Sequence, residues 1–197
     1  VAVDGNGNVY VPGEFKGSLS IGGTNLTSTG GKDGFVAKFT SAGVLQWARQ
    51  MSGASDCCDP TGASVDVSGN VYLAGGFGNA VGDTISFGPS ITLTNIGGGI
   101  PGVGVGDAFL VKYDGSTGNA QWARRAGGTN SDGYLGVSTD FRGNVYVGGA
   151  TGGTGLPDGF NAVVAKYDNN GVVQWTQSST GTNGALVWAG PLVDAAG

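Results

Sequence analysis

A repeated unit runs along this 197-residue chain and restricts its fold more than any other feature. Three segments share an aspartate that is followed by Gly-Asn-Val-Tyr, and a fourth begins with the same Val-Asp. The segments are Val3-Asp4-Gly5-Asn6-Gly7-Asn8-Val9-Tyr10, Val65-Asp66-Val67-Ser68-Gly69-Asn70-Val71-Tyr72, Thr139-Asp140-Phe141-Arg142-Gly143-Asn144-Val145-Tyr146 and Val193-Asp194-Ala195-Ala196-Gly197. Self-similarity of this kind is the sequence signature of a repeat architecture.

Two further blocks follow each complete aspartate segment in a fixed order. An apolar run ends in Lys38, Lys112 or Lys166, and a Gln-Trp pair then places Trp47, Trp122 or Trp175. The aspartates recur after 62, 74 and 54 residues, whereas the lysine and the tryptophan are always 9 or 10 residues apart. The variation in length therefore falls between the tyrosine and the lysine, which is typical of one tolerant surface loop.

Each unit is predicted to form four antiparallel strands. The aspartate segment gives a short first strand and a turn, Asn-Val-Tyr gives the second strand, the lysine block the third and Gln-Trp the fourth. The run Ala108–Val111 is apolar at successive residues, which indicates that both faces of the strand are covered. Face-to-face stacking of such sheets around an axis predicts an all-β fold made of β-propeller blades.

The three blocks together resemble the SBBP repeat family of bacterial β-propellers. The resemblance covers the whole chain and is strongest in the middle unit, through residues 66–72, 107–114 and 121–124. The third unit departs from it with Asn161 in the place of Asp33 and Asp107, and with Thr176 after its tryptophan. The resemblance implies a secreted or cell-surface location and an architecture, but no particular reaction.

One partial propeller domain is expected over residues 1–197, with blades at about 1–62, 63–136 and 137–190 and the start of another at 191–197. Three blades do not close a ring, because about four to eight are typical. We therefore expect further blades, either from missing sequence or from other copies of the chain. The break at Gly197, inside a motif, favours missing sequence.

Composition excludes several other classes of protein. The 42 glycines, and the thirteen aspartates against the single Glu14, favour turns over helices. A net charge of −5 with scattered basic residues argues against a nucleic-acid partner. The sequence contains no histidine and no apolar run of about 20 residues, so no membrane span is expected, and no cofactor is predicted.

The repeated residues are interpreted as structural. Asp4, Asp66, Asp140 and Asp194 are expected to cap turns rather than to bind calcium, because no glutamate follows at the twelfth position of a calcium loop. Pairing with Asp33, Asp107 or an aspartate of the neighbouring blade, or extension to the rim, is expected for the lysines. The tryptophans of the repeat are expected to pack between blades, whereas Trp188 falls outside the pattern.

Cys57 and Cys58 are adjacent and are the only cysteines. Three states remain open, namely two free thiols, a strained vicinal disulfide, or bonds to other chains. The vicinal disulfide is favoured in a secreted protein.

Residues 97–106 form the most glycine-rich stretch, and it contains Gly97, Gly99, Ile100, Pro101 and Gly104. A phosphate-binding loop needs a helix after it, and a strand is expected here instead. We interpret the stretch as a flexible insertion and a candidate binding loop, one of three variable loops at 17–31, 76–106 and 148–159.

Two functions follow from these observations. The first is a non-catalytic scaffold or binding module for a protein or glycan partner. The alternative is a fragment of a pyrroloquinoline-quinone dehydrogenase, because residues 114–122 also resemble the tryptophan-docking repeat of those propellers and adjacent cysteines can lie against the quinone. Against this alternative, the Asn-Val-Tyr block is not theirs, and no calcium-binding constellation can be placed.

Overall fold

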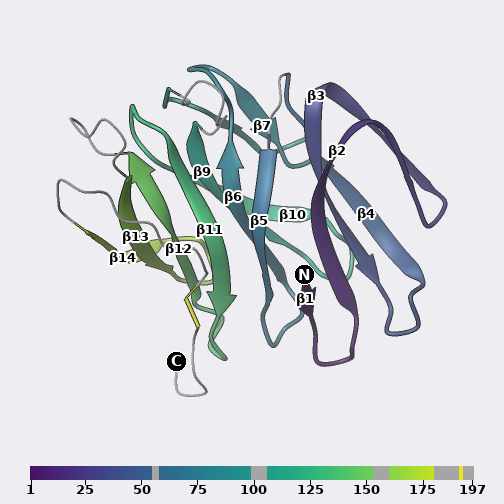
Figure 1. The fold of residues 1–197 in the computed structure, drawn as a ribbon. Helices are drawn as coiled ribbons and strands as arrows, with labels where there is room; N and C mark the ends of the chain where they lie inside the picture. The colour runs from purple at the N-terminus through teal and green to yellow at the C-terminus, as the bar shows by residue number, and fades with distance from the viewer. Residues whose placement is uncertain (55–57, 99–105, 153–159, 180–190, 193–197) are drawn as a thin grey trace.

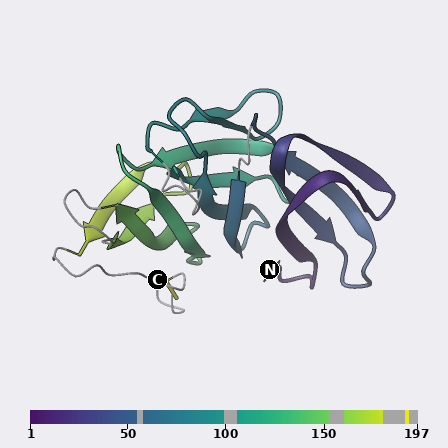
Figure 2. The same ribbon diagram turned by 45° about the horizontal axis from the view of Figure 1, so that its top comes forward.

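Three four-stranded antiparallel sheets stand side by side in a curved row (Figures 1 and 2). The computed structural model describes residues 1–54, 58–98, 106–152, 160–179 and 191–192. The first sheet contains β1 (Ala2–Val3), β2 (Val9–Ile21), β3 (Thr24–Phe39) and β4 (Leu45–Met51). The second contains β5 (Cys58–Val65), β6 (Val71–Phe77), β9 (Asp107–Tyr113) and β10 (Ala120–Ala126), and the third contains β11 (Asp132–Thr139), β12 (Val145–Gly152), β13 (Phe160–Tyr167) and β14 (Val173–Ser178). A separate hairpin, β7 (Thr84–Ser86) and β8 (Thr92–Thr94), projects from the second sheet.

The all-β class and the four antiparallel strands per unit are confirmed. The described sheets form an open row and do not close on themselves. No helix in the described part of the chain is long and apolar enough to cross a membrane.

The core lies between the sheets, and the second sheet is covered on both faces. Every residue of β6 and β9 is buried, as their continuous apolarity predicted. Alternate side chains point to opposite faces of a strand, so Leu73 and Phe109 join the cluster shared with the first sheet. Tyr72 and Leu110 join the cluster shared with the third sheet.

The sequence placed the repeat boundaries inside strands of the structure. The boundary between residues 62 and 63 falls within β5, and the one between 136 and 137 falls within β11. The recurring aspartate comes directly after the first strand of each sheet. Most of β5 and most of β11 therefore precede the aspartate segment from which the repeats were counted.

Two of the expected variable loops contain regular structure. Residues 17–31 belong mainly to the extended hairpin of β2 and β3, which pair through Ile21 and Thr24 at its tip. Residues 76–106 include the β7–β8 hairpin, whose three-residue strands are too short to be recognised from alternation in the sequence.

Candidate functional site

Each repeated aspartate that the structure describes organises a turn through four hydrogen bonds. Asp66 Oδ1 accepts from the backbone N–H groups of Ser68 and Asn70, both at 2.9 Å. Its Oδ2 accepts from Asn70 Nδ2 at 2.9 Å and from the Tyr72 hydroxyl at 3.0 Å. Gly69 completes the turn at a φ of 81°, which favours glycine. The spacing Asp-x-x-Gly-Asn-x-Tyr is therefore a turn motif.

The same four bonds recur around Asp4 and Asp140. The donors are the N–H groups of Asn6, Asn8, Arg142 and Asn144, the amides of Asn8 and Asn144, and the hydroxyls of Tyr10 and Tyr146. Asp194 lies outside the described residues.

The repeated lysines and tryptophans join neighbouring sheets. Lys38 Nζ and Trp47 Nε1 of the first sheet donate to the carbonyl oxygen of Gly115, in the β9–β10 turn, at 2.8 and 3.1 Å. Lys112 Nζ and Trp122 Nε1 of the second sheet donate in the same way to Asn169, in the β13–β14 turn, at 3.2 and 3.0 Å. We call this arrangement, a lysine and a tryptophan of one sheet on a turn carbonyl of the next, the clasp.

Lys38 and Lys112 do not form the pairing with Asp33 or Asp107 that was one of the expectations for them. Asp33 accepts from the side chain of Gln50, and Asp107 forms an ion pair with Arg125, whereas Lys38 and Lys112 donate to backbone carbonyls.

The indole of each clasp packs over a turn glycine. A Cβ at Gly118 would lie 2.7 Å from the Trp47 ring, and one at Gly171 would lie 3.0 Å from the Trp122 ring. Arg124 adds further donors, because its Nε bonds to the carbonyl of Gly171 at 2.8 Å. Close packing and shared hydrogen bonds therefore fix the position of each turn against the preceding sheet.

Lys166 and Trp175 keep the part of this arrangement that lies within one sheet, which is their packing against a tyrosine. The Lys166 ammonium lies 5.1 Å from the centre of the Tyr146 ring, and the centre of the Trp175 ring lies 6.3 Å from the centre of the Tyr146 ring. The Trp175 side chain is 41% exposed, compared with 6% for Trp47.

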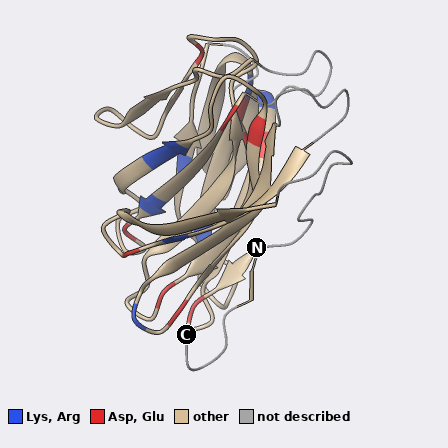
Figure 3. Cartoon of the chain, turned by 90° about the vertical axis from the view of Figure 1, so that its left-hand side faces the viewer, with Lys and Arg blue, Asp and Glu red and all other residues tan. Residues whose placement is uncertain are grey.

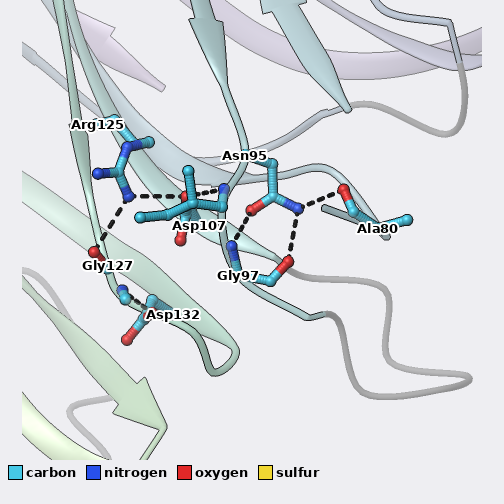
Figure 4. A network of polar contacts seen from close by, with 9 residues as sticks. Ala80, Asn95, Gly97, Asp107, Arg125, Gly127 and Asp132 are labelled. Carbon is cyan, nitrogen blue, oxygen red and sulfur yellow. Dashed lines mark hydrogen bonds and ion pairs between the residues drawn. The ribbon is translucent and has the colours of Figure 1, made fainter. Parts of the chain in front are cut away.

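The start of the stretch 97–106 is anchored by Asn95 (Figure 4). Its side-chain amide donates to the carbonyl oxygens of Ala80 and Gly97 at 2.8 and 3.0 Å, and its Oδ1 accepts from the Gly97 N–H at 3.0 Å. Gly97 thus belongs to a rigid loop base. Gly99, Ile100, Pro101 and Gly104 lie outside the described residues.

The buried Asp107 anchors the end of the same stretch (Figure 4). Its Oδ2 accepts from Arg125 Nη1 at 2.9 Å and from the Ile96 N–H at 2.8 Å. Arg125 also donates to the carbonyl of Gly127, so the charge of Asp107 ties the loop to β10.

A groove of about 660 Å³ lies between the first and second sheets. Thr27 and Thr29 of the β2–β3 hairpin line one side, and the tip of the β7–β8 hairpin, residues 87–91, lines another. Arg49 and Tyr113 also line it. Two of the three segments that vary between repeats therefore meet at this groove.

The Tyr113 hydroxyl is buried and has no hydrogen-bond partner among the described residues. Burial raises the pKa of this phenol well above its usual range, which keeps it neutral. The equivalent Tyr167 of the third sheet shares a hydrogen bond of 2.8 Å with the Tyr134 hydroxyl. Pro60 occupies the position of Tyr134 in the second repeat and its side chain has no polar atom, which explains the unmatched hydroxyl.

A smaller groove of about 230 Å³ occupies the equivalent place between the second and third sheets. Both members of the Tyr134–Tyr167 pair line it. The larger groove therefore differs from its counterpart in volume and in its unpaired hydroxyl.

Cys58 is disulfide-bonded. Cys57 lies outside the described residues, so the vicinal pairing stays a prediction. Across the described ranges, no three acidic, cysteine or histidine side chains gather closely enough to hold a metal ion.

In comparisons with known proteins, no family model matches the chain and no curated protein matches it. The SBBP resemblance thus rests on the repeat motifs alone.

Replacing the turn aspartate should destabilise the protein strongly. We expect Asp66→Ala to lower the free energy of unfolding by about 3 kcal/mol, because hydrogen bonds to a carboxylate are lost and the buried Tyr72 hydroxyl is left unpaired. Urea unfolding measures the change. The neighbouring Val67→Ala, at a side chain that is 78% exposed, is the control and should change little. Equal losses in the two variants would contradict this role for Asp66.

Acid should weaken the β9–β10 turn. Hydrogen bonds from the Ser116 hydroxyl, from the Thr117 backbone and hydroxyl and from the Ser116 backbone outweigh the effect of burial and lower the pKa of Asp114 from 3.8 to about 2. The ionised form is favoured in the folded state, so its stabilisation is present above pH 3.8 and is lost as the pH falls toward 2. The pKa values of Asp4 and Asp140 are lowered too, since hydrogen bonds to their turns outweigh burial. Figure 3 shows acidic segments in the turns at the lower end of the sheets.

Urea unfolding over this pH range tests the prediction. Asp114→Asn should flatten the fall in stability, and Ser116→Ala should reduce it, because Ser116 supplies the largest stabilisation of the carboxylate. Burial raises the pKa of Asp132, so this residue makes the protein more stable as the pH falls. The contribution of Asp114 is therefore measured as the difference in pH dependence between each variant and the unaltered protein. An unchanged pH profile in both variants would contradict the assignment.

Alanine substitutions at Gly43 and Gly171 distinguish the cost of backbone strain from the cost of a collision with the clasp indole. Their φ angles are 78° and 77°, but a Cβ at Gly171 meets Trp122 and one at Gly43 meets nothing within 4 Å. We expect Gly171→Ala to lower the free energy of unfolding by about 1–2 kcal/mol more than Gly43→Ala does, because only the new methyl group at position 171 collides with Trp122. Urea unfolding in dilute solution measures both, and equal losses would show that the indole does not limit this position.

Proposed function

We propose that this chain is a non-catalytic binding module and scaffold, built from β-propeller blades, which binds a glycan or a short protein segment in the groove between its first two sheets. The SBBP resemblance and the stacking of three equivalent sheets support the propeller assignment. The repeated residues support the scaffold role, because the described aspartates hold turns and two of the lysine–tryptophan pairs hold neighbouring sheets together.

The unmatched Tyr113 hydroxyl is the observation that carries the proposal. A buried hydroxyl without a partner costs about 1–3 kcal/mol, and native proteins rarely retain one without a role. The third repeat avoids this cost through Tyr134. Because this hydroxyl is buried, a ligand hydroxyl or carbonyl in the groove can complete its hydrogen bonding only when the neighbouring side chains move aside.

The remaining lining suits a ligand with polar groups on an apolar frame. Phe87 and Ile91 offer apolar surface, Thr27 and Thr29 offer hydroxyl groups, and Arg49 offers a guanidinium. A largely apolar lining with a few polar groups is the usual character of a site for small or oligomeric ligands. Because the walls belong to segments that vary between the repeats, specificity can differ while the sheets stay the same.

An extracellular location is part of this proposal. The disulfide at Cys58 is typical of an oxidising compartment. The low content of charged residues, at 12%, and the abundance of glycine fit the secreted surface proteins that the motif resembles.

Binding on a glycan array and on a peptide array tests the function. The best oligosaccharide or peptide is then titrated calorimetrically against Tyr113→Phe, for which we expect affinity to fall about tenfold while stability is kept or raised. Tyr167→Phe is the matched control, because it should lose stability through Tyr134 and keep its affinity. No binding on either array, or equal affinity of Tyr113→Phe and the unaltered protein, would refute the proposal.

A further inference from the structure

Among the described residues the clasp is formed twice, and its donor half is present a third time with no acceptor from that part of the chain. Trp175 and Lys166 hold the same positions around Tyr146 that Trp122 and Lys112 hold around Tyr72. The two tryptophan–tyrosine ring distances are 6.0 and 6.3 Å, so the third pair is already arranged for docking. Neither Trp175 Nε1 nor Lys166 Nζ donates a hydrogen bond to any residue that the structure describes.

The strand that carries Trp175 lacks the cover that its equivalents have. Every residue of β14 is exposed, whereas β4 and β10 include buried residues. Exposed indole and apolar surface on a sheet at the end of a stack marks an interaction surface.

The acceptor half is also present in the β3–β4 turn at residues 40–44, where no lysine or tryptophan of the described ranges donates to it. This turn repeats the hydrogen bonds of the β13–β14 turn, which Trp122 clasps. The Thr40 N–H donates to the Val44 carbonyl at 2.8 Å, as Asp168 does to Val172 at 2.9 Å. Gly43 donates to the Thr40 carbonyl at 2.9 Å, as Gly171 does to Asp168 at 3.0 Å.

The surface over this turn is open where the equivalent surfaces are covered. Indole rings cover Gly118 and Gly171, but nothing lies within 4 Å of a Cβ at Gly43. Ser41, whose carbonyl corresponds to the Asn169 acceptor, is exposed. The β3–β4 turn and β14 lie at opposite ends of the row of sheets (Figure 1), so they do not meet within the described part of one chain.

We propose that Trp175 and Lys166 of one copy clasp the turn 40–44 of a second copy, which joins chains head to tail. The donor and acceptor surfaces differ, so the contact is heterologous and each chain can use both ends. Gln177 stands where Arg49 and Arg124 stand in the other sheets, and it cannot supply their several guanidinium donors. The contact between chains is therefore weaker than the internal clasps and depends on protein concentration. The proposal is independent of a ligand in the groove.

Two variants, each of which disables one half of the contact, test the proposal by light scattering and sedimentation over a wide range of concentration. Trp175→Ala removes the donor indole, and Gly43→Asn places a side chain over the acceptor turn. Asparagine tolerates the left-handed φ of 78°, so the turn is retained. The unaltered protein should form assemblies of more than one chain, and each variant alone should weaken association by more than about tenfold.

Mixing the two variants provides the decisive measurement. The Gly43→Asn chain retains its donor and the Trp175→Ala chain retains its acceptor, so an equal mixture should form a species of two chains that does not grow further. Gly17→Asn, at a φ of 76° with open space around it, is the control for backbone strain and should assemble like the unaltered protein. Urea unfolding verifies that all variants are folded.

Three results would overturn the proposal. They are an unaltered protein that stays monomeric at every concentration, single variants that assemble as it does, and a mixture in which the two variants do not pair.

Discussion

The relation between neighbouring sheets depends on one backbone carbonyl that receives two side-chain donors. The oxygen of Gly115 accepts from both Lys38 and Trp47, and Asn169 does the same for Lys112 and Trp122. An ammonium and an indole N–H converge on one atom of a tight turn, which fixes the position of that atom against the preceding sheet. Apolar packing alone would stabilise the stack with less directional control, because the hydrophobic effect is non-directional.

The aspartate turn orients the donors of the clasp. Asp66 holds the hydroxyl of Tyr72. The Lys112 ammonium lies 5.5 Å and the Trp122 ring centre 6.0 Å from the centre of the Tyr72 ring, and Lys112 is paired in register with both residues. Each carboxylate thereby positions a tyrosine, the tyrosine positions a lysine and a tryptophan, and these hold the next sheet. Residues that are separated in the sequence thus act as one structural unit.

Repetition made the strands and turns predictable, because the three described turn aspartates perform the same task, and so do two of the three lysine–tryptophan pairs. A short first strand was expected in each repeat, but the full length of β5 and β11 was not predicted, because their sequences share little with each other. The turn carbonyls that accept from Lys38 and Lys112 were not predicted, because a backbone carbonyl leaves no mark in the sequence. The unmatched Tyr113 hydroxyl reflects a difference between repeats, Pro60 in one and Tyr134 in the other, and this difference can be interpreted only once the position of Tyr113 is known.

The direction of the clasp sets how such a chain can change in length during evolution. Donors lie on one face of each sheet and the accepting turn belongs to the sheet beyond it, so a whole unit can be duplicated or deleted without altering either surface at the new junction. Loss of part of a unit would instead leave a lysine–tryptophan pair without its accepting turn, or a turn without its donors. Gene duplication can therefore produce series of different lengths from one ancestral unit, while the walls of the grooves between units diverge separately.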